Sequence, residues 1–216
     1  MSGQPAFLFD LDGTLVESAA GVVNGFHYAI ERMGLVFPDG LQERRLVGPP
    51  LLWSFREFWG LDDTDAERAV MLYREYYGTR GVYEAVPYPG MEDLLGELAA
   101  AGARLCIATS KYGVMARKML DHLGLTPLFA HLSMSEGREG HSTKEALING
   151  CLEALRIPAT KAVMVGDTGF DARGARETGV PFIGVLYGYG TREEMRAEGA
   201  SRFAADVAEL KALLFA

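Results

Sequence analysis

The stretch that most constrains this chain is residues 7–14, FLFDLDGT, where an apolar run meets two carboxylates and then a glycine. Such a run, rich in aromatic residues, is typical of a strand buried on both faces of a parallel sheet. Residues i and i+2 of an extended chain point the same way, so Asp10 and Asp12 would project together beyond the strand's carboxyl end, where open α/β sheets bind their ligands. Taken alone, the pattern also fits a strand that ends in a solvated acidic turn.

Beyond Gly90 the chain alternates between strand and helix patterns, which indicates a parallel sheet with crossover helices. The predicted fold is therefore α/β, with a Rossmann-like parallel sheet as the core and helices on both of its faces. Strands are predicted at 104–110, 129–135, 161–167 and 181–188, and helices at 91–98, 114–123, 147–155, 172–178 and 205–214.

A long interval between the first strand and this alternating half shows helical patterns only. Apolar residues from Val22 to Met33 recur at helical spacing, and a Gly-Pro-Pro break at 48–50 precedes a segment rich in aromatic residues. A further helix is predicted over 66–77. The predicted domains are an α/β core of residues 1–16 with 87–216 and an inserted all-helical cap of residues 17–86.

Composition and charge narrow the class of protein. The 216 residues carry a net charge of −8, which argues against binding nucleic acid through a basic face. No apolar run reaches about 18 residues and no secretory signal pattern opens the chain, so we expect a cytoplasmic protein that does not span a membrane. Cys106 and Cys151 lie in apolar segments, which predicts buried thiols rather than a disulfide.

Polar side chains follow the later strands or open the helices between them. Each has an ordinary alternative, because a Thr-Ser pair can cap a helix, a first-turn lysine can be solvated, and two aspartates can form an acidic helix start. A Walker-type phosphate loop is disfavoured because no glycine directly precedes the lysine. Together with Asp10 and Asp12, these groups predict one site at the edge where the strands end. They are Thr109, Ser110, Lys111, Lys144, Asp167 and Asp171.

These motifs resemble those of the haloacid dehalogenase-like hydrolase superfamily. DLDGT at residues 10–14 is similar to its first motif, Ser110 or Thr109 to its second, Lys144 to its third, and GDTGFD at residues 166–171 to its fourth. The resemblance covers the whole chain, including a helical cap inserted after the first motif. The segments IATSK, VMVGD and GVLYGYGTREE are similar to the branch that contains phosphoglycolate phosphatases and 5'-nucleotidase-like enzymes.

The resemblance implies a covalent phosphoryl transfer. Asp10 would be the nucleophile that attacks phosphorus and forms an aspartyl-phosphate. Asp12 would protonate the leaving alkoxide and then deprotonate the hydrolytic water. The ammonium of Lys144 and the hydroxyl of Ser110 or Thr109 would bind the phosphoryl oxygens. The predicted catalytic residues are Asp10, Asp12, Ser110 and Lys144.

The resemblance also implies a magnesium site. Asp10, the backbone carbonyl of Asp12, and Asp167 would hold Mg²⁺, and Asp171 would support them as an outer ligand.

Substrate contacts are predicted at the second motif and in the cap. Lys111 is expected either to contact substrate or to begin a helix. Arg45 and Gly48, in a loop that runs to Pro50, are predicted to contact the leaving group, although helix punctuation also explains that loop. The predicted substrate-binding residues are Thr109, Ser110, Lys111, Lys144, Gly48 and Arg45.

The predicted function is that of a Mg²⁺-dependent phosphatase of small phosphomonoesters, similar to 5'-nucleotidases or phosphoglycolate phosphatases. Asp12 favours an alkoxide leaving group over a carbon-halogen or carbon-phosphorus bond, and Thr14 resembles phosphatases, whereas sugar phosphomutases more often carry Val there. A sugar phosphomutase or a pyrophosphatase of the same superfamily is the alternative.

A phospho-accepting domain of the receiver type is the alternative from another class. It is disfavoured because the DxD pattern comes first in this chain and a helical insertion follows it. The expected partner is a small phosphorylated metabolite, and the sequence leaves open its identity and whether the protein is a monomer or a homodimer.

Overall fold

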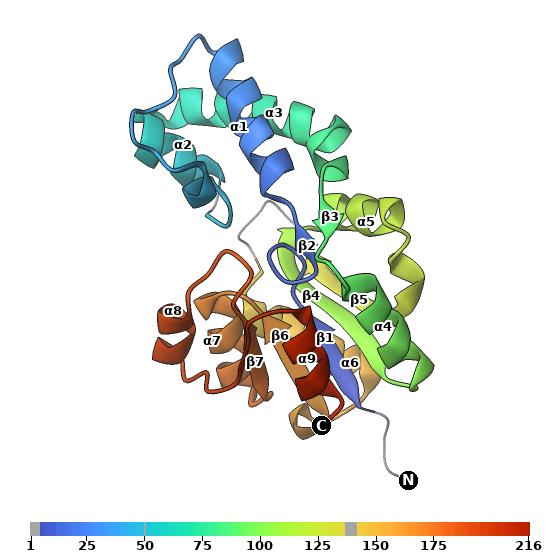
Figure 1. Cartoon of the computed structure of the whole chain (residues 1–216). Helices are drawn as coiled ribbons and strands as arrows, with labels where there is room; N and C mark the ends of the chain where they lie inside the picture. Colours follow the sequence, from blue (N-terminus) through green and yellow to red (C-terminus); the bar gives the residue numbers. More distant parts are fainter. Residues whose placement is uncertain (1–4, 50, 137–141) are drawn as a thin grey trace. The chain divides into compact units, whose positions relative to one another are not determined.

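The computed structural model describes residues 5–49, 51–136 and 142–216 (Figure 1). The chain divides into two compact units, one of residues 1–17 with 86–216 and one of residues 18–85. We call the first the core unit and the second the cap unit.

A six-stranded parallel sheet forms the centre of the core unit (Figure 1). Its strand order is β5-β4-β1-β6-β7-β8, so the chain builds the sheet outward from β1 in one direction and then in the other. This is the α/β, Rossmann-like arrangement that the sequence predicted. The strands are β1 (Ala6–Phe9), β4 (Arg104–Tyr112), β5 (Phe129–Ser135), β6 (Ala162–Gly166), β7 (Phe182–Val185) and β8 (Phe203–Ala204).

Strand β1 occupies the centre because all four of its residues are apolar and buried. Its last residue, Phe9, pairs with Ile107 of β4 on one side and with Val165 of β6 on the other. The residues that follow these three positions therefore meet at the carboxyl edge of the sheet, at the point where the strand order reverses.

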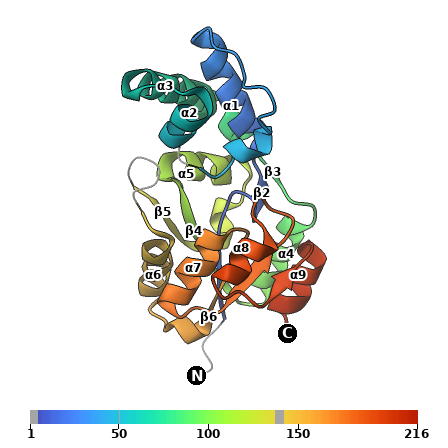
Figure 2. The same ribbon diagram turned by 90° about the vertical axis from the view of Figure 1, so that its left-hand side faces the viewer.

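Helices cover both faces of this sheet (Figure 2). Helices α6 and α7 lie on one face, and α4 and α9 lie on the other. Alternate strand residues such as Leu8, Cys106 and Met164 form an apolar cluster with Ile148 and Cys151 of α6. The helices of the core unit are α4 (Met91–Ala100), α5 (Gly113–His122), α6 (Lys144–Leu155), α7 (Gly169–Thr178), α8 (Arg192–Ala197) and α9 (Val207–Leu214).

The two cysteines behave as the sequence predicted. Cys106 and Cys151 are buried thiols that form no disulfide. Among the helices of the described segments, none combines the length and the apolarity needed to cross a bilayer.

The described part of the cap unit contains helices and no strands. An aromatic cluster forms its interior: the ring of Phe26 lies 4.8 Å from Phe55 and 5.2 Å from Tyr73, measured between centroids. Aromatic pairs at such distances add to the free energy of burial. The elements are α1 (Ala19–Arg32), α2 (Leu51–Trp59), α3 (Asp63–Thr79) and the short 3₁₀ helices at Glu43–Leu46 and Gly81–Tyr83.

Several short elements were not predicted. Strands β2 (Val16–Glu17) and β3 (Val86–Pro87) pair antiparallel where the chain leaves and re-enters the core unit. Two residues are too few to show an alternating pattern, and a proline argues against a strand. Strand β8, with two residues, was missed for the same reason, and helix α8, with six residues, is less than two turns long.

Candidate active site

Asp10 directly follows β1 and extends its pairing by one residue, because its backbone N–H donates to the carbonyl of Val165 at 2.9 Å. The chain then turns tightly: the N–H groups of Leu15 and Val16 both donate to the carbonyl of Leu11. Asp10 is only 9% exposed, so the alternative of a solvated acidic turn is wrong for this residue.

Lys144 supplies a buried positive charge beside Asp10. It opens α6 behind the capping residue Thr143, whose hydroxyl accepts a hydrogen bond from Ala146 N–H at 3.2 Å. Its ammonium nitrogen lies 2.8 Å from Oδ1 of Asp10, 2.8 Å from Oδ1 of Asp171 and 2.9 Å from the carbonyl oxygen of Ala108. The contacts with Asp10 and with Ala108 are hydrogen bonds donated by the ammonium, and the contact with Asp171 is an ion pair. The alternative of a solvated first-turn lysine is therefore wrong.

Burial alone would lower the pKa of Lys144, but the negative charges of Asp10 and Asp171 outweigh it and raise the pKa above its usual value. Lys144 is thus held as a cation in a place where an unpaired charge would be costly.

Asp167 follows β6 and is fully buried. Its Oδ1 accepts a hydrogen bond from the Thr14 hydroxyl at 3.0 Å, and its Oδ2 accepts one from the Tyr189 N–H at 2.8 Å. Gly13 has φ +81°, and a Cβ there would collide with Oδ2 of Asp167. The turn after β1 thus requires glycine both for its backbone conformation and for its contact with Asp167.

Asp171 lies in the first turn of α7 and is also fully buried. Its Oδ2 accepts a hydrogen bond from the N–H of Thr168 at 3.0 Å, which is one half of a capping box, and a second one from the hydroxyl of Thr168 at 2.7 Å. Its Oδ1 faces Lys144. Asp171 is therefore both an acidic helix start, which was the ordinary alternative, and a member of the buried charge cluster.

These carboxylates form a cluster that suits a divalent cation. One oxygen from each of Asp10, Asp167 and Asp171 lies within 4.8 Å of the others. Burial raises the pKa of Asp10 to about 6 in spite of Lys144, and burial together with Asp171 and Asp10 raises that of Asp167 to about 8. Lys144 forms ion pairs with Asp10 and Asp171 but none with Asp167, so the ionised carboxylates outnumber the ammonium that contacts them among the residues the structure describes. A hard cation with oxygen ligands would compensate for the remaining negative charge, and the donor set fits Mg²⁺.

The second motif lies within β4 rather than at a helix start. Thr109 is buried and its hydroxyl accepts a hydrogen bond from the N–H of Lys111 at 3.2 Å, whereas Ser110 is exposed. The ammonium of Lys111 lies 2.9 Å from each carboxylate oxygen of Asp12. Helix α5 begins only at Gly113, so the suggestion that Lys111 begins a helix is wrong.

The predicted cap residues belong to the other unit of the chain. The guanidinium of Arg45 lies over the ring of Phe58, 5.2 Å from its centroid. Gly48 has φ +106°, and a Cβ there would meet open space. Pro50 lies outside the described residues. Contact of Arg45 and Gly48 with a substrate stays a prediction.

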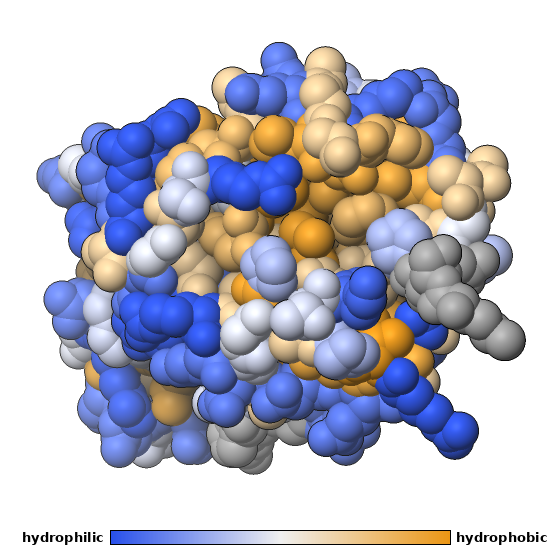
Figure 3. Space-filling view, turned by 90° about the horizontal axis from the view of Figure 1, so that it is seen from below, coloured by the Kyte–Doolittle hydropathy of each residue, from blue (hydrophilic) through white to orange (hydrophobic). Residues whose placement is uncertain are grey.

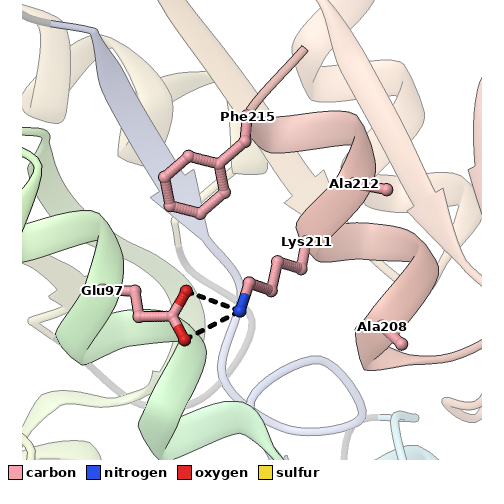
Figure 4. Close-up of a pocket in the computed structure, with 5 residues that line it drawn as sticks. All are labelled: Glu97, Ala208, Lys211, Ala212 and Phe215. Carbon is pink, nitrogen blue, oxygen red and sulfur yellow. Dashed lines mark hydrogen bonds and ion pairs between the residues drawn. The ribbon is translucent and has the colours of Figure 1, made fainter.

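A pocket elsewhere in the core unit has different chemistry. It is an open surface pocket of about 340 Å³ between α4 and α9, and its lining includes the ion pair of Lys211 with Glu97 (Figure 4). Hydrophobic residues also gather on the face shown in Figure 3, with hydrophilic residues around them. Surface apolar groups of this kind are common and identify no reaction. The pocket shares no lining residue with the carboxylate cluster, which therefore remains the candidate site.

Residues 7–185 match the family model described as haloacid dehalogenase-like hydrolase. The chain belongs to this family. The match confirms the resemblance drawn from the motifs. A 5'-nucleotidase from Pseudomonas aeruginosa is 37% identical to this hydrolase over 210 residues, which are 97% of this chain and 95% of the relative.

Two further relatives and a solved structure extend the comparison. A phosphoglycolate phosphatase from Agrobacterium fabrum is 32% identical over 190 residues, 86% of this chain and 82% of the relative. Tyrosine-protein kinase PtkA from Mycobacterium tuberculosis is 36% identical over 183 residues, 85% of this chain and 62% of the kinase. The structure of a predicted phosphatase from Clostridium acetobutylicum has a TM-score of 0.87 to this hydrolase at 36% identity, with 99% of each chain covered.

Two contacts of the site were not predicted from the sequence. The pairing of Lys111 with Asp12 joins residues 99 positions apart, and no local pattern indicates it. The hydrogen bond from the Tyr189 N–H to Asp167 was also missed. Gly188 and Gly190, which follow a predicted strand, could have indicated that the backbone there closely approaches another part of the chain.

Proposed function

We propose that this hydrolase is a Mg²⁺-dependent phosphatase that cleaves small phosphomonoesters through an aspartyl-phosphate on Asp10. The observation that carries the proposal is the buried cluster of Asp10, Asp167 and Asp171, whose oxygens lie within 4.8 Å of one another, with the Lys144 ammonium 2.8 Å from Asp10. The relatives named 5'-nucleotidase and phosphoglycolate phosphatase support phosphomonoesters as substrates.

The reaction has two steps. In the first, a carboxylate oxygen of Asp10 bonds to phosphorus, the ester P–O bond breaks, and Asp12 gives a proton to the departing alkoxide. In the second, Asp12 takes a proton from water, whose oxygen bonds to phosphorus and releases phosphate and the Asp10 carboxylate. The same carboxyl group thus serves as acid and then as base, and Asp10 ends as it began.

The other residues of the site orient the Asp10 carboxylate or compensate the negative charge of the phosphoryl group. The ion pair to Lys144 fixes Oδ1 of Asp10, which leaves the carboxylate in one orientation. Mg²⁺, held by Asp10 and Asp167 with the carbonyl of Asp12, would supply positive charge beside the phosphoryl oxygens. Ser110 or Thr109 donates a hydrogen bond to the same oxygens.

The size of the required rate acceleration explains why general acid-base catalysis by Asp12 alone is insufficient. Hydrolysis of phosphate monoesters can need acceleration of up to ~10²¹-fold, or roughly 28 kcal/mol. General acid-base catalysis typically gives ~10²–10⁴-fold, or about 3–5 kcal/mol. Asp12 therefore accounts for a small part, and the covalent step with its surrounding charges must supply the rest.

The proposed substrates are nucleoside 5'-monophosphates, with phosphoglycolate as the second candidate. The order follows the relatives, because the 5'-nucleotidase aligns with 97% of this chain at 37% identity. The two substrates differ in the group beyond the ester, so a direct comparison of kcat/KM separates them.

The test is phosphate release by purified protein from nucleoside monophosphates, phosphoglycolate, sugar phosphates and pyrophosphate, with Mg²⁺ and then with a chelator. We expect steady turnover that requires Mg²⁺ and is highest with one of the two proposed substrates. An absence of turnover on every substrate overturns the proposal. Transfer of label from ATP to a tyrosine peptide, without phosphate release, would instead support a kinase activity, which is the activity named for the relative PtkA. Transfer of label to the protein alone would support a receiver-type domain.

A further inference from the structure

Tyr189 connects Asp167 to a residue outside the carboxylate cluster. Its backbone N–H donates to Oδ2 of Asp167 at 2.8 Å, and its side-chain hydroxyl donates to Oε1 of Glu17 at 3.0 Å. Glu17 ends strand β2 and is the last residue of the core unit before the chain enters the cap unit. One residue therefore joins Asp167 to the end of this strand.

The backbone around Tyr189 is in close contact with Asp167. A Cβ at Gly188 would collide with the Cβ of Asp167, and a Cβ at Gly190 would collide with the Asp167 carbonyl oxygen. Only glycine permits such an approach of backbone. Because the peptide on each side of Tyr189 packs against Asp167, the position of the Tyr189 N–H and the orientation of the carboxylate depend on each other.

A second chain of hydrogen bonds holds the other carboxylate oxygen. The hydroxyl of Tyr187 donates to the carbonyl of Thr14 at 3.1 Å, and the hydroxyl of Thr14 donates to Oδ1 of Asp167 at 3.0 Å. Oδ2 of Asp167 is thus oriented by Tyr189 itself, and Oδ1 by Thr14, whose carbonyl accepts the hydrogen bond from Tyr187. The first chain of hydrogen bonds runs from Glu17 to the Tyr189 hydroxyl and from the Tyr189 N–H to Asp167.

We propose that Tyr189 is a positioning residue for Asp167 and that Glu17 anchors the Tyr189 side chain. This inference rests on the metal site of the proposed function. A ligand that is already oriented loses less conformational freedom when the metal binds, so outer partners raise metal affinity without touching the ion. The role belongs to the hydroxyl as well as to the N–H, because the hydroxyl fixes the place of the residue that carries the N–H.

The test is the metal affinity of Tyr189→Phe, Glu17→Ala and the double variant, measured by calorimetry with Mg²⁺ and with Mn²⁺ as a probe. Phe keeps the backbone N–H and removes only the hydroxyl. We expect each single variant to bind about tenfold more weakly, the low end of the usual cost of losing an outer partner of a metal ligand. The double variant should bind no more weakly than the singles, because both remove the same hydrogen bond.

A second readout separates positioning from general loss of structure. At saturating Mg²⁺ the variants should recover most of the wild-type kcat, while the Mg²⁺ concentration for half-maximal activity rises by the same factor as the Kd. The matched control is Tyr83→Phe, which removes the same atom from a tyrosine of the cap unit and should leave the Kd unchanged.

The outcomes separate this inference from the function on which it rests. A wild-type protein that binds neither Mg²⁺ nor Mn²⁺ overturns the metal site and the inference with it. If the wild type binds metal and Tyr189→Phe binds it equally well, the positioning role is wrong and the proposed function stands. Additive losses in the double variant would also contradict the role, because they would mean that Glu17 and Tyr189 act separately.

Discussion

The ammonium of Lys111 lies 2.9 Å from both carboxylate oxygens of Asp12, a contact between a strand residue and the turn after β1. The side chain of Lys111 is 10% exposed and that of Asp12 is 24% exposed. The pair is therefore partly shielded from water, which strengthens it relative to a surface ion pair. Because both oxygens are engaged, the pair restricts rotation of the Asp12 carboxylate.

Replacing Lys111 should slow the chemical step by loosening Asp12. We expect Lys111→Ala to lower kcat by about 10- to 100-fold with an alkyl phosphate, within the range that general acid-base catalysis contributes. The loss should be smaller with p-nitrophenyl phosphate, whose leaving group needs little help from a proton donor. Steady-state kinetics on both substrates checks this, and an equal loss on both would contradict it.

The control for this variant is Lys161→Ala. Lys161 is exposed and precedes β6, at the end of that strand opposite to Asp167. The Lys161→Ala variant loses the same charge from the protein as a whole as Lys111→Ala does, so we expect its kcat and KM to match those of the wild type. A similar loss in both variants would assign the effect to net charge rather than to Asp12.

Asp10→Asn should abolish turnover while the protein still folds. The amide has nearly the shape of the carboxylate and its oxygen can still accept the hydrogen bond from Lys144, but it cannot form an aspartyl-phosphate. We expect kcat to fall more than about 10³-fold, with a change in unfolding free energy within about 2 kcal/mol. Phosphate release and thermal unfolding measure the two quantities, and a wild-type rate in the purified variant would remove Asp10 from its proposed role.

The sequence predicted the sheet and the convergence of its polar residues because both follow from local patterns. Asp10 and Asp167 directly follow apolar strands, so a parallel sheet with β1 and β6 adjacent is enough to bring them together. Lys144 was predicted through the family motif, whereas its contacts with Asp10, Asp171 and Ala108 became visible only in the structure.

The rest of the site depends on contacts between residues far apart in the chain. The pairing of Lys111 with Asp12 requires the register of β4 against β1, which no pattern around Lys111 encodes. The same is true of Tyr189 and Glu17, which are 172 positions apart. Two-residue strands such as β2 are likewise invisible in the sequence, since they form only where two connections already lie together.

Gly188→Ala should disturb the site without touching a reactive group. The added methyl group would collide with the Cβ of Asp167 and with the Gly13 carbonyl oxygen, so one of them must shift. Overpacking of this kind typically costs about 1–3 kcal/mol, and the displaced carboxylate should also weaken metal binding. Urea unfolding and metal titration check the two effects.

Gly96→Ala provides the matched control for this substitution. Gly96 lies within α4, and a Cβ there would meet no atom within 4 Å. Alanine in a helix interior is favoured over glycine by about 0.5–1 kcal/mol, so this variant should be slightly more stable and bind metal normally. Equal destabilisation by both substitutions would show that the contact with Asp167 is not the cause.

The buried carboxylates predict how stability depends on pH when no metal is bound. Burial, opposed by Lys144, raises the pKa of Asp10 to about 6, and burial with the neighbouring carboxylates raises that of Asp167 to about 8. In the unfolded chain both groups lose their protons near pH 4. Between about pH 4 and pH 8 these two groups therefore bind more protons in the folded state than in the unfolded state, and their contribution to the free energy of unfolding falls as the pH rises.

We therefore expect the Tm in chelator to be lower at about pH 8 than at about pH 5, by at least about 5 °C, given that 1 kcal/mol shifts the Tm of a protein of this size by about 2–4 °C. Added Mg²⁺ should restore the Tm mainly at the higher pH, because a cation stabilises the ionised carboxylates and competes with their protons. Asp167→Asn should flatten the dependence, since it removes the group with the larger shift. A Tm in chelator that rises from pH 5 to pH 8 would mean that Asp10 and Asp167 are already ionised in the folded state near pH 5, and the raised pKa values of the two carboxyl groups would then be wrong.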